Sequence, residues 1–417
     1  MTWSAVRLAA AKVGPTVMFA TRNPIPLINY GGHLGLTFPA LQFQVAWISG
    51  KQIRGPDYKR PAPWPYKEKK YRWYHEYFDD TLSRFDENTK VVVVDGNIAA
   101  GKTTFAEELA KQLDMHFVPE ADMDMRYIND YGFDMRTLDP LLPASCKSCD
   151  VKTFYENPSN ENVPEFQFQM YKLRYEQYID ALAHLLQTGQ GVVMDRSVYS
   201  DFVFLEAMVK FGYISKPARN LYYEIKNNTI GELLRPHLVI YLDVPVNILM
   251  DRIMKRNLPH EINSKVLTKE YLETLDHYYK QEYLKQISKH AELLIYDWSN
   301  YGDVEVVVED IERIDFDRFE KHDPKLKDWR IDDRWEWNGL RRTFSNMKYK
   351  LMSLFGIPNL NVPELLISAE DYKKYIDVME NAPGNKYAKG FNKDMGDKGI
   401  LFKMFLNYRD SQKVSIP

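Results

Sequence analysis

Residues 91–104 restrict the fold of this chain more than any other stretch. They open with four consecutive valines, which indicate a strand that is buried on both faces. Gly96, Gly101, Lys102 and Thr103 then match the pattern G-x-x-x-x-G-K-[ST] of a phosphate-binding loop, and helix-forming residues follow at once. Strand, loop and helix in this order are the context that the pattern requires. The alternative is a glycine-containing turn that holds a lysine by chance.

The chemistry of such a loop explains its spacing. Its glycines let backbone N–H groups turn towards phosphate oxygens, and the start of the helix adds partial positive charge. Lys102 is expected to reach the outer phosphates, and the Thr103 hydroxyl is expected to bind Mg²⁺. The expected phosphate-binding residues are Gly96, Asn97, Ala99, Ala100, Gly101, Lys102, Thr103 and Thr104.

Short apolar segments alternate with long helical ones from residue 90 onwards. The strand candidates are 91–94, 116–118, 191–194, 238–243 and 293–296. The helical segments include 164–186, 216–234, 246–256 and 268–289. This alternation predicts an α/β fold with a five-stranded parallel sheet and helices on both faces. Ligands of such folds bind at the carboxyl ends of the strands.

Charged residues follow the second and third strand candidates. Glu120 follows the second, and Asp195 and Arg196 end the third. Asp195 is expected beside the phosphate loop, where it would hold Mg²⁺ directly or through water. Arg196 is expected to reach a phosphate oxygen. The alternative for this pair is an ordinary surface ion pair.

The helical segment 246–256 carries two arginines on one face, Arg252 and Arg256, four residues apart. Arginines on a helix that covers a site can clamp a phosphoryl group during its transfer. The alternative is a basic helix end in solvent.

The two cysteines, Cys146 and Cys149, form a CxxC motif within a loop-like sequence. No second CxxC or histidine pair completes a zinc site, so we interpret them as loop thiols, with a redox dithiol as the alternative. Two cysteines make no disulfide framework, which favours a reducing compartment. A net charge of -3 predicts no general affinity for nucleic acid.

The N-terminal 50 residues contain no acidic residue but have Arg7, Lys12 and Arg22 among apolar ones. This composition is typical of a mitochondrial transit peptide, and a disordered N-terminus is the alternative. No segment has the length of a transmembrane helix. Pro61, Pro63 and Pro65 exclude a regular element there, so we expect residues 51–89 to be an extended arm, with a short helix as a further expectation at 74–85. We therefore divide the chain into 1–50, 51–89, a phosphate-loop domain at 90–314, and a C-terminal extension at 315–417.

Between about residues 90 and 300 these motifs together resemble the deoxynucleoside kinase family. The phosphate loop matches closely, and Asp195-Arg196-Ser197 stands at the family's Glu/Asp-Arg-Ser motif. The resemblance implies a nucleoside-kinase-like fold that binds ATP or a deoxynucleotide with Mg²⁺. In an active kinase, Glu120 would be the general base and Arg196 the second catalytic residue. It also implies a nucleoside site formed by Tyr155, Phe168, Gln169, Asp201 and Glu261.

Two positions depart from the family pattern. A third lid arginine is expected two residues after Arg256, where this chain has Leu258. Loss of one such cation can slow phosphoryl transfer by roughly 10²–10³. The base site of the family often has an arginine at the position where this chain has Glu176, although Arg174 is near.

A narrower resemblance covers nearly the whole chain, to the family of nucleoside-kinase-like accessory subunits of mitochondrial NADH:ubiquinone oxidoreductase, respiratory complex I. Segments 188–193, 200–205, 236–241 and 259–261 carry it. It implies a peripheral position on the matrix side of the inner membrane, and other complex I subunits as partners, including those of the membrane arm. It implies a supporting role without an iron–sulfur cluster. The alternative is a free, active mitochondrial deoxynucleoside kinase that transfers the ATP γ-phosphate to a nucleoside 5′-hydroxyl.

The C-terminal extension alternates charge and tryptophan. A helical stripe is formed by Trp337, Leu340, Phe344, Met347, Leu351 and Leu354. This stripe either packs on the chain's own core or anchors a partner protein. Pro383-Gly384 and residues 390–399 predict an irregular tail, which partners could order.

Overall fold

The computed structural model describes residues 48–51, 62–318 and 323–399. Residues 1–47 of the predicted transit peptide lie outside the described residues. The strands are β1 (Val91–Gly96), β2 (His116–Val118), β3 (Val192–Asp195), β4 (Leu238–Asp243) and β5 (Glu292–Asp297). They form one sheet in the order β2-β3-β1-β4-β5, and every pairing is parallel. The predicted five-stranded parallel sheet is therefore confirmed.

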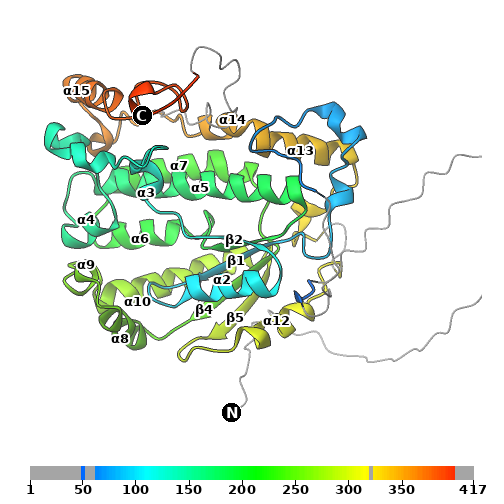
Figure 1. Cartoon of the computed structure of the whole chain (residues 1–417). Helices are drawn as coiled ribbons and strands as arrows, with labels where there is room; N and C mark the ends of the chain where they lie inside the picture. Colours follow the sequence, from blue (N-terminus) through cyan, green and yellow to red (C-terminus); the bar gives the residue numbers. More distant parts are fainter. Residues whose placement is uncertain (1–47, 52–61, 319–322, 400–417) are drawn as a thin grey trace, which may run out of the picture.

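Helices surround this sheet (Figure 1). Their bounds are α2 (Lys102–Gln112), α3 (Asp124–Tyr127), α4 (Val151–Glu156), α5 (Val163–Thr188), α6 (Phe202–Lys210), α7 (Lys216–Thr229), α8 (Val246–Arg256), α9 (Pro259–Ile262), α10 (Lys269–Tyr278), α11 (Leu284–Ile287), α12 (Val304–Glu312), α13 (Arg334–Asn346), α14 (Lys348–Ser353) and α15 (Ala369–Glu380). Figure 1 shows α5, α6 and α7 together above the level of α8, α9 and α10. The valines of β1 are fully buried between the layers.

The segment predicted as one helix at 268–289 differs in the structure. A π-helical turn, Tyr279–Tyr283, separates α10 from α11. Such turns insert an extra residue and occur often at functional sites. Here the turn directs two buried tyrosines at the strand ends: Tyr283 donates to Asp95 at 2.6 Å, and Tyr279 contacts Arg196.

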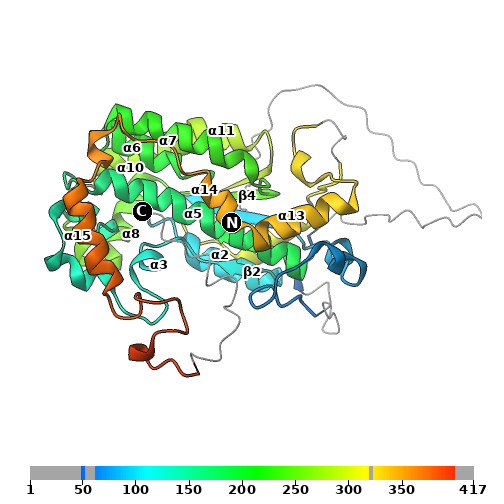
Figure 2. The ribbon, with the colours of Figure 1, turned by 90° about the horizontal axis from the view of Figure 1, so that it is seen from above.

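The C-terminal extension packs first along α5. α13 and α14 run beside α5, with the arm at the far end of α13 (Figure 2). Trp337, Phe344 and Leu351 of the predicted stripe are buried against the chain's own core. The stripe is thus part of this core, and the interpretation as a partner anchor is wrong for these three residues.

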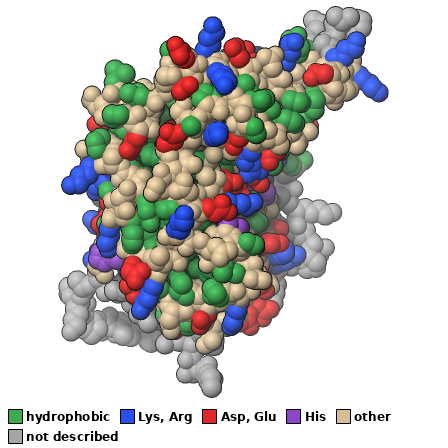
Figure 3. Space-filling model, turned by 90° about the vertical axis from the view of Figure 1, so that its left-hand side faces the viewer, with side chains coloured by type: hydrophobic (Ala, Val, Ile, Leu, Met, Phe, Trp, Pro, Cys, Tyr) green, Lys and Arg blue, Asp and Glu red, His purple; other side chains and the backbone are tan. Residues whose placement is uncertain are grey.

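The rest of the extension covers the opposite end of the molecule. Tyr131 contacts the tail at three points: its hydroxyl donates to Asp397 at 2.5 Å and accepts from the Gly390 N–H at 2.8 Å and from Asn392. The tail up to residue 399 is therefore ordered by contacts within the chain. On this end, acidic and basic side chains are interspersed, with small groups of hydrophobic ones between them (Figure 3). Within the described residues, no helix has the length and apolar content needed to cross a membrane.

Candidate functional site

The phosphate loop joins β1 to α2 at the carboxyl end of the sheet. Gly101 precedes α2 with a φ of +91°, and a Cβ there would stand 2.9 Å from the ring of Tyr301. Both facts require glycine at this position. Lys102 is buried and donates to the carbonyl of Asn97 at 2.9 Å. Burial, with repulsion from Arg196, lowers the pKa of Lys102 to about 8.

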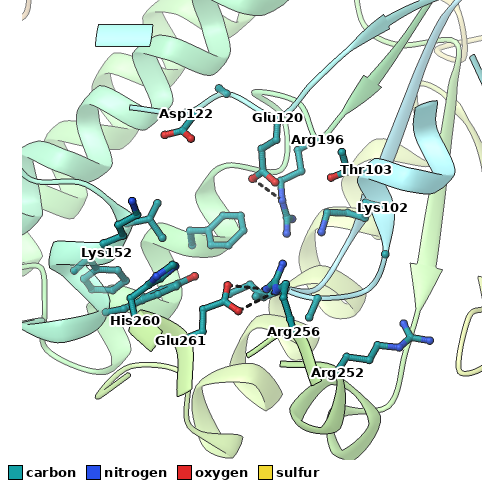
Figure 4. Close-up of a pocket in the computed structure, with 18 of the residues that line it drawn as sticks. Lys102, Thr103, Glu120, Asp122, Lys152, Arg196, Arg252, Arg256, His260 and Glu261 are labelled. Carbon is teal, nitrogen blue, oxygen red and sulfur yellow. Dashed lines mark hydrogen bonds and ion pairs between the residues drawn. The ribbon is translucent and has the colours of Figure 1, made fainter. Parts of the chain in front are cut away.

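Arg196 connects the loop to the end of β2. Its side chain donates to the carbonyl of Gly96 at 2.8 Å, and its Nε lies 2.8 Å from a carboxylate oxygen of Glu120 (Figure 4). Its backbone has a φ of +64°, a region that few residues other than glycine adopt. Such local strain is maintained where the surroundings fix it, commonly at functional sites.

Glu120 lies between two arginines. Besides Arg196, its carboxylate is 3.2 Å from Arg174 of α5. Burial alone would raise the pKa of Glu120, but the charges of Arg196, Lys102 and Arg174 outweigh burial and hold that pKa below its usual value. Glu120 is therefore ionised at neutral pH, as a proton acceptor must be.

Asp195 and Thr103 suit a magnesium ion. One oxygen of Asp195 accepts from the Thr103 hydroxyl, and the other is buried without a hydrogen-bond partner. Burial raises the pKa of Asp195, so a cation beside it would relieve a real cost. In the described parts of the chain, no group of three or more His, Cys, Asp or Glu could hold a metal. Mg²⁺ here would take its remaining ligands from phosphate oxygens and water.

The two lid arginines already have protein partners. Arg256 makes a two-pronged contact with Glu261, at 2.9 and 2.7 Å. Arg252 donates to the carbonyls of Ala100, Trp298 and Ser299, and its guanidinium lies 4.4 Å from the centre of the Tyr301 ring. In Figure 4, Arg256 points to the same centre as Lys102 and Arg196, whereas Arg252 points away.

A cavity of about 1130 Å³ joins these groups. The predicted residues that line it are Ala99, Gly101, Lys102, Thr103, Thr104, Glu120, Tyr155, Arg196, Arg252, Arg256 and Glu261. Others stand behind its walls: Gly96, Asn97, Ala100, Asp195 and Asp201. Tyr155 stacks on His260 with ring centres 6.3 Å apart.

The α5 side of the cavity differs from the residues we predicted. Phe166, Gln167 and Met170 line it, whereas Phe168 and Gln169 do not. Phe168 packs against Tyr222, and Gln169 accepts from Arg126 at 2.9 Å. Residues two positions apart on a helix face different sides, so a shift of two changes the face completely.

The apparent departure at Glu176 has the same cause. Arg174 lines the cavity, while Glu176 faces α14 and lies 2.8 Å from Lys348. Arg174 also contacts the fully buried Asp201, which accepts from Gln167 at 2.9 Å and from Tyr222 at 2.5 Å. Spacing could have found this set, because Gln167, Met170 and Arg174 recur at intervals of three and four.

None of the residues in the wall opposite the phosphate loop, which we call the outer wall, was predicted from the sequence. It contains Asp122, Asp124, Arg136, Asp150 and Lys152. Arg136 holds it together through ion pairs with Asp124 (2.8 Å), Asp134 (2.9 Å) and Asp150 (3.3 Å). No local sequence pattern marks these residues, because short irregular segments carry them. The nearby Cys146 and Cys149 are free thiols, and burial raises the pKa of each, which disfavours the reactive thiolate.

Comparison with known proteins decides the family. The model of the family "Deoxynucleoside kinase" matches residues 92–330. The chain belongs to the deoxynucleoside kinase family.

Three relatives show how far the similarity extends. The mitochondrial "NADH dehydrogenase [ubiquinone] 1 alpha subcomplex subunit 10" of Mus musculus is 39% identical over 327 residues, 78% of this chain and 87% of that protein. A deoxyguanosine kinase of Dictyostelium discoideum is 28% identical over 57% of this chain and 74% of its own length. The solved structure of a deoxyadenosine kinase from M. mycoides with bound dATP has a TM-score of 0.40 and is 22% identical in sequence. The match covers 53% of this chain and 96% of that one.

Proposed function

We propose that this chain is an accessory, nucleotide-binding subunit of mitochondrial respiratory complex I, without a catalytic role of its own. It supports assembly and stability as a peripheral subunit on the matrix side of the inner membrane. The extent of the similarity carries this proposal. The mouse complex I subunit aligns over 327 residues, well beyond the 239 residues of the kinase family match, whereas the Dictyostelium kinase aligns over 237. The residues beyond the kinase-like domain have a use in a subunit that contacts other chains, whereas a free kinase does not need them.

The cavity supports a bound nucleotide with Mg²⁺. The side chains of Lys102 and Arg196 converge on the end of the cavity that the phosphate loop lines, where phosphates would lie (Figure 4). Thr103 and Asp195 would hold the cation. Tyr155 and Glu261 suit the sugar, and the α5 face with Phe166 and Gln167 suits the base. A few convergent polar groups at the end of a large cavity are typical of cofactor sites.

The lid supports binding without phosphoryl transfer. Catalysis of phosphoryl transfer needs cations that are already aimed at the group on which charge develops in the transition state. Here Arg256 is neutralised by Glu261, Arg252 is held by three carbonyls, and Leu258 replaces a further cation. The second candidate, an active deoxynucleoside kinase, is favoured by the intact pair of Glu120 and Arg196 beside a complete phosphate loop.

The test is rescue of cells that lack the subunit. Glu120→Gln keeps the shape of the side chain, so we expect wild-type complex I abundance and NADH:ubiquinone activity. Gly101→Val, whose side chain would collide with Tyr301, is expected to lower both severalfold. Protein levels of both variants are followed by immunoblot. Failure of Glu120→Gln to rescue at a normal protein level would favour the kinase.

A further inference from the structure

Five aromatic side chains form an exposed patch at the junction of the arm and α13. We call Trp73, Tyr74, Tyr77, Phe78 and Trp335 the aromatic patch. Their exposed fractions are 54, 39, 62, 89 and 45%. Four of the rings are contiguous: Trp73 lies 6.0 Å from Tyr74 and 6.3 Å from Tyr77, and Tyr77 lies 5.5 Å from Trp335. The most exposed member, Phe78, directly follows Tyr77 in the chain. A contiguous apolar surface of this kind marks an interaction site more often than a chance exposure.

The patch stands on a rigid base. Beneath it, the fully buried Glu76 accepts from the hydroxyls of Tyr71 and Thr81 at 2.7 and 2.9 Å and from Asn338 at 3.2 Å. Each of these bonds ties the arm to itself or to α13. The aromatic side chains are therefore exposed on an ordered surface.

A second buried residue joins the same base to the core. Arg341 is completely buried, lies 2.8 Å from Asp79, donates to Gln187 of α5 at 2.9 Å, and stacks 3.8 Å from the Tyr71 ring. Rigid aromatic anchors lose little conformational freedom on binding, which is why tryptophan and tyrosine dominate the energetically important centres of interfaces. The base thus preorganises the patch for a partner.

The surroundings of the patch indicate the chemistry of that partner. On the arm side, Lys67, Lys69 and Arg72 are exposed with a single acidic residue, Glu68, between the two lysines, so this side is cationic on balance. Glu76 is withdrawn into the buried network. On the α13 side, Asp333 and Glu336 are exposed beside Trp335. Arg334 between them is paired with Glu76 and Asp80 of the arm. The patch therefore has a cationic flank and an anionic flank. An anionic membrane would attract the first and repel the second, whereas a protein can match both.

We propose that the aromatic patch is the docking surface for a protein partner that presents aliphatic side chains between an acidic and a basic group. This rests on the proposed function, so the partner is another complex I subunit. The patch lies at the end of the molecule away from α15, α8 and α9 (Figures 1 and 2), and none of its residues lines the cavity. Docking there leaves the mouth of the nucleotide cavity open.

The first experiment replaces Phe78 and Trp335 with serine in the full chain. The matched control replaces Leu360 and Tyr387, which are 78 and 56% exposed but outside the patch. We expect the fraction of the protein that comigrates with complex I on native gels to fall at least tenfold for the patch variant and to match wild type for the control. Comigration of the patch variant at the wild-type level would overturn the docking surface. If wild-type protein itself does not comigrate, the proposed function fails instead.

Two further measurements keep the result interpretable. Thermal unfolding of the purified variants identifies loss by misfolding. If the patch variant is unstable, a photoreactive benzoylphenylalanine at position 78 replaces it, and crosslinks to a peptide of another complex I subunit are expected. Crosslinks to lipid alone would overturn the inference. The inference would also be overturned if wild-type protein, but not the patch variant, floated with vesicles that contain anionic phospholipid. That result would mean that the patch binds a membrane.

Discussion

The two walls of the cavity are held by different means. The phosphate wall consists of the loop after β1 and the end of β3, and sheet register sets its geometry: Val94 pairs with Asp195, which places Arg196 next to Gly96. The outer wall consists of residues 122–152, short turns joined by the ion pairs of Arg136. One wall is part of a parallel sheet, and the other is irregular chain held by charge.

The outer wall also depends on the end of the chain. Asp371 of α15 accepts from Ser145 at 2.9 Å, the Pro383 carbonyl accepts from Asn129 at 2.7 Å, and Tyr131 binds Asp397. These tail residues lie beyond the 92–330 range of the family match. The phosphate wall is thus intrinsic to the kinase-like domain, whereas the extension stabilises the outer wall. A change in the extension should therefore affect the nucleoside end of the site before the phosphate end.

The largest effect should come from breaking the buried ion pair between Arg174 of α5 and Asp201, which follows β3 in the chain. Arg174→Met leaves the fully buried Asp201 without its cation, and removal of one partner from a buried pair costs about 3–5 kcal/mol. We expect a loss of that size in the free energy of urea unfolding. Lys348→Met removes ion pairs to the more exposed Glu176 and Asp180 and should cost less than about 1 kcal/mol. Equal losses would contradict the distinction.

The titration of Lys102 provides a test of the phosphate wall alone. Its pKa is about 8 in the folded protein and 10.5 ordinarily, so the unfolded chain binds more protons between these values. The contribution of Lys102 to the free energy of unfolding therefore rises with pH from about 8 to 10. Nucleotide binding shows the opposite trend, because phosphate favours the charged ammonium and the complex takes up a proton.

Affinity for nucleotide should accordingly fall by up to about tenfold per pH unit above 8. Titration calorimetry in two buffers of different ionisation enthalpy measures the proton uptake directly. Lys102→Met should bind more weakly and lose this uptake. A wild-type affinity that does not change between pH 8 and 9.5 would show that Lys102 does not meet the phosphates.

The smallest expected effect probes the outer wall. Tyr131→Phe removes the hydroxyl that binds Asp397, Gly390 and Asn392. Loss of such bonds costs about 1–3 kcal/mol locally, so amide exchange in residues 369–397 should accelerate. Nucleotide affinity should fall only about threefold, because no phosphate contact changes.

Tyr387→Phe is the matched control for this change, since the Tyr387 side chain is largely exposed at 56%. Faster exchange in both variants would mean that the tail responds to any tyrosine loss. No change in either would show that the extension and the outer wall are independent.

The sequence alone determined the phosphate wall. The bounds of the five strands were predicted to within two residues, because continuous apolar runs have little other solution than a buried strand. The helical segments predicted at 216–234 and 268–289 are longer than α7 and α10 in the structure. Glu120, Asp195, Arg196 and the loop were placed together because parallel strands end at one edge. Here the local sequence pattern gives the strands, and the parallel sheet brings their carboxyl ends together, so both place the same residues in the phosphate wall.

Tertiary structure decided the rest. The rotation of α5 about its axis put Gln167 and Arg174 in the cavity and Gln169 outside it, and rotation is set by packing on both sides of a buried helix. Tyr301 meets Gly101 from 200 residues away, and Asp397 meets Tyr131 from 266. The aromatic patch exists because Glu76 and Arg341, from opposite ends of the chain, are buried together. Contacts between segments so distant in sequence leave no local pattern, so only the folded chain reveals them.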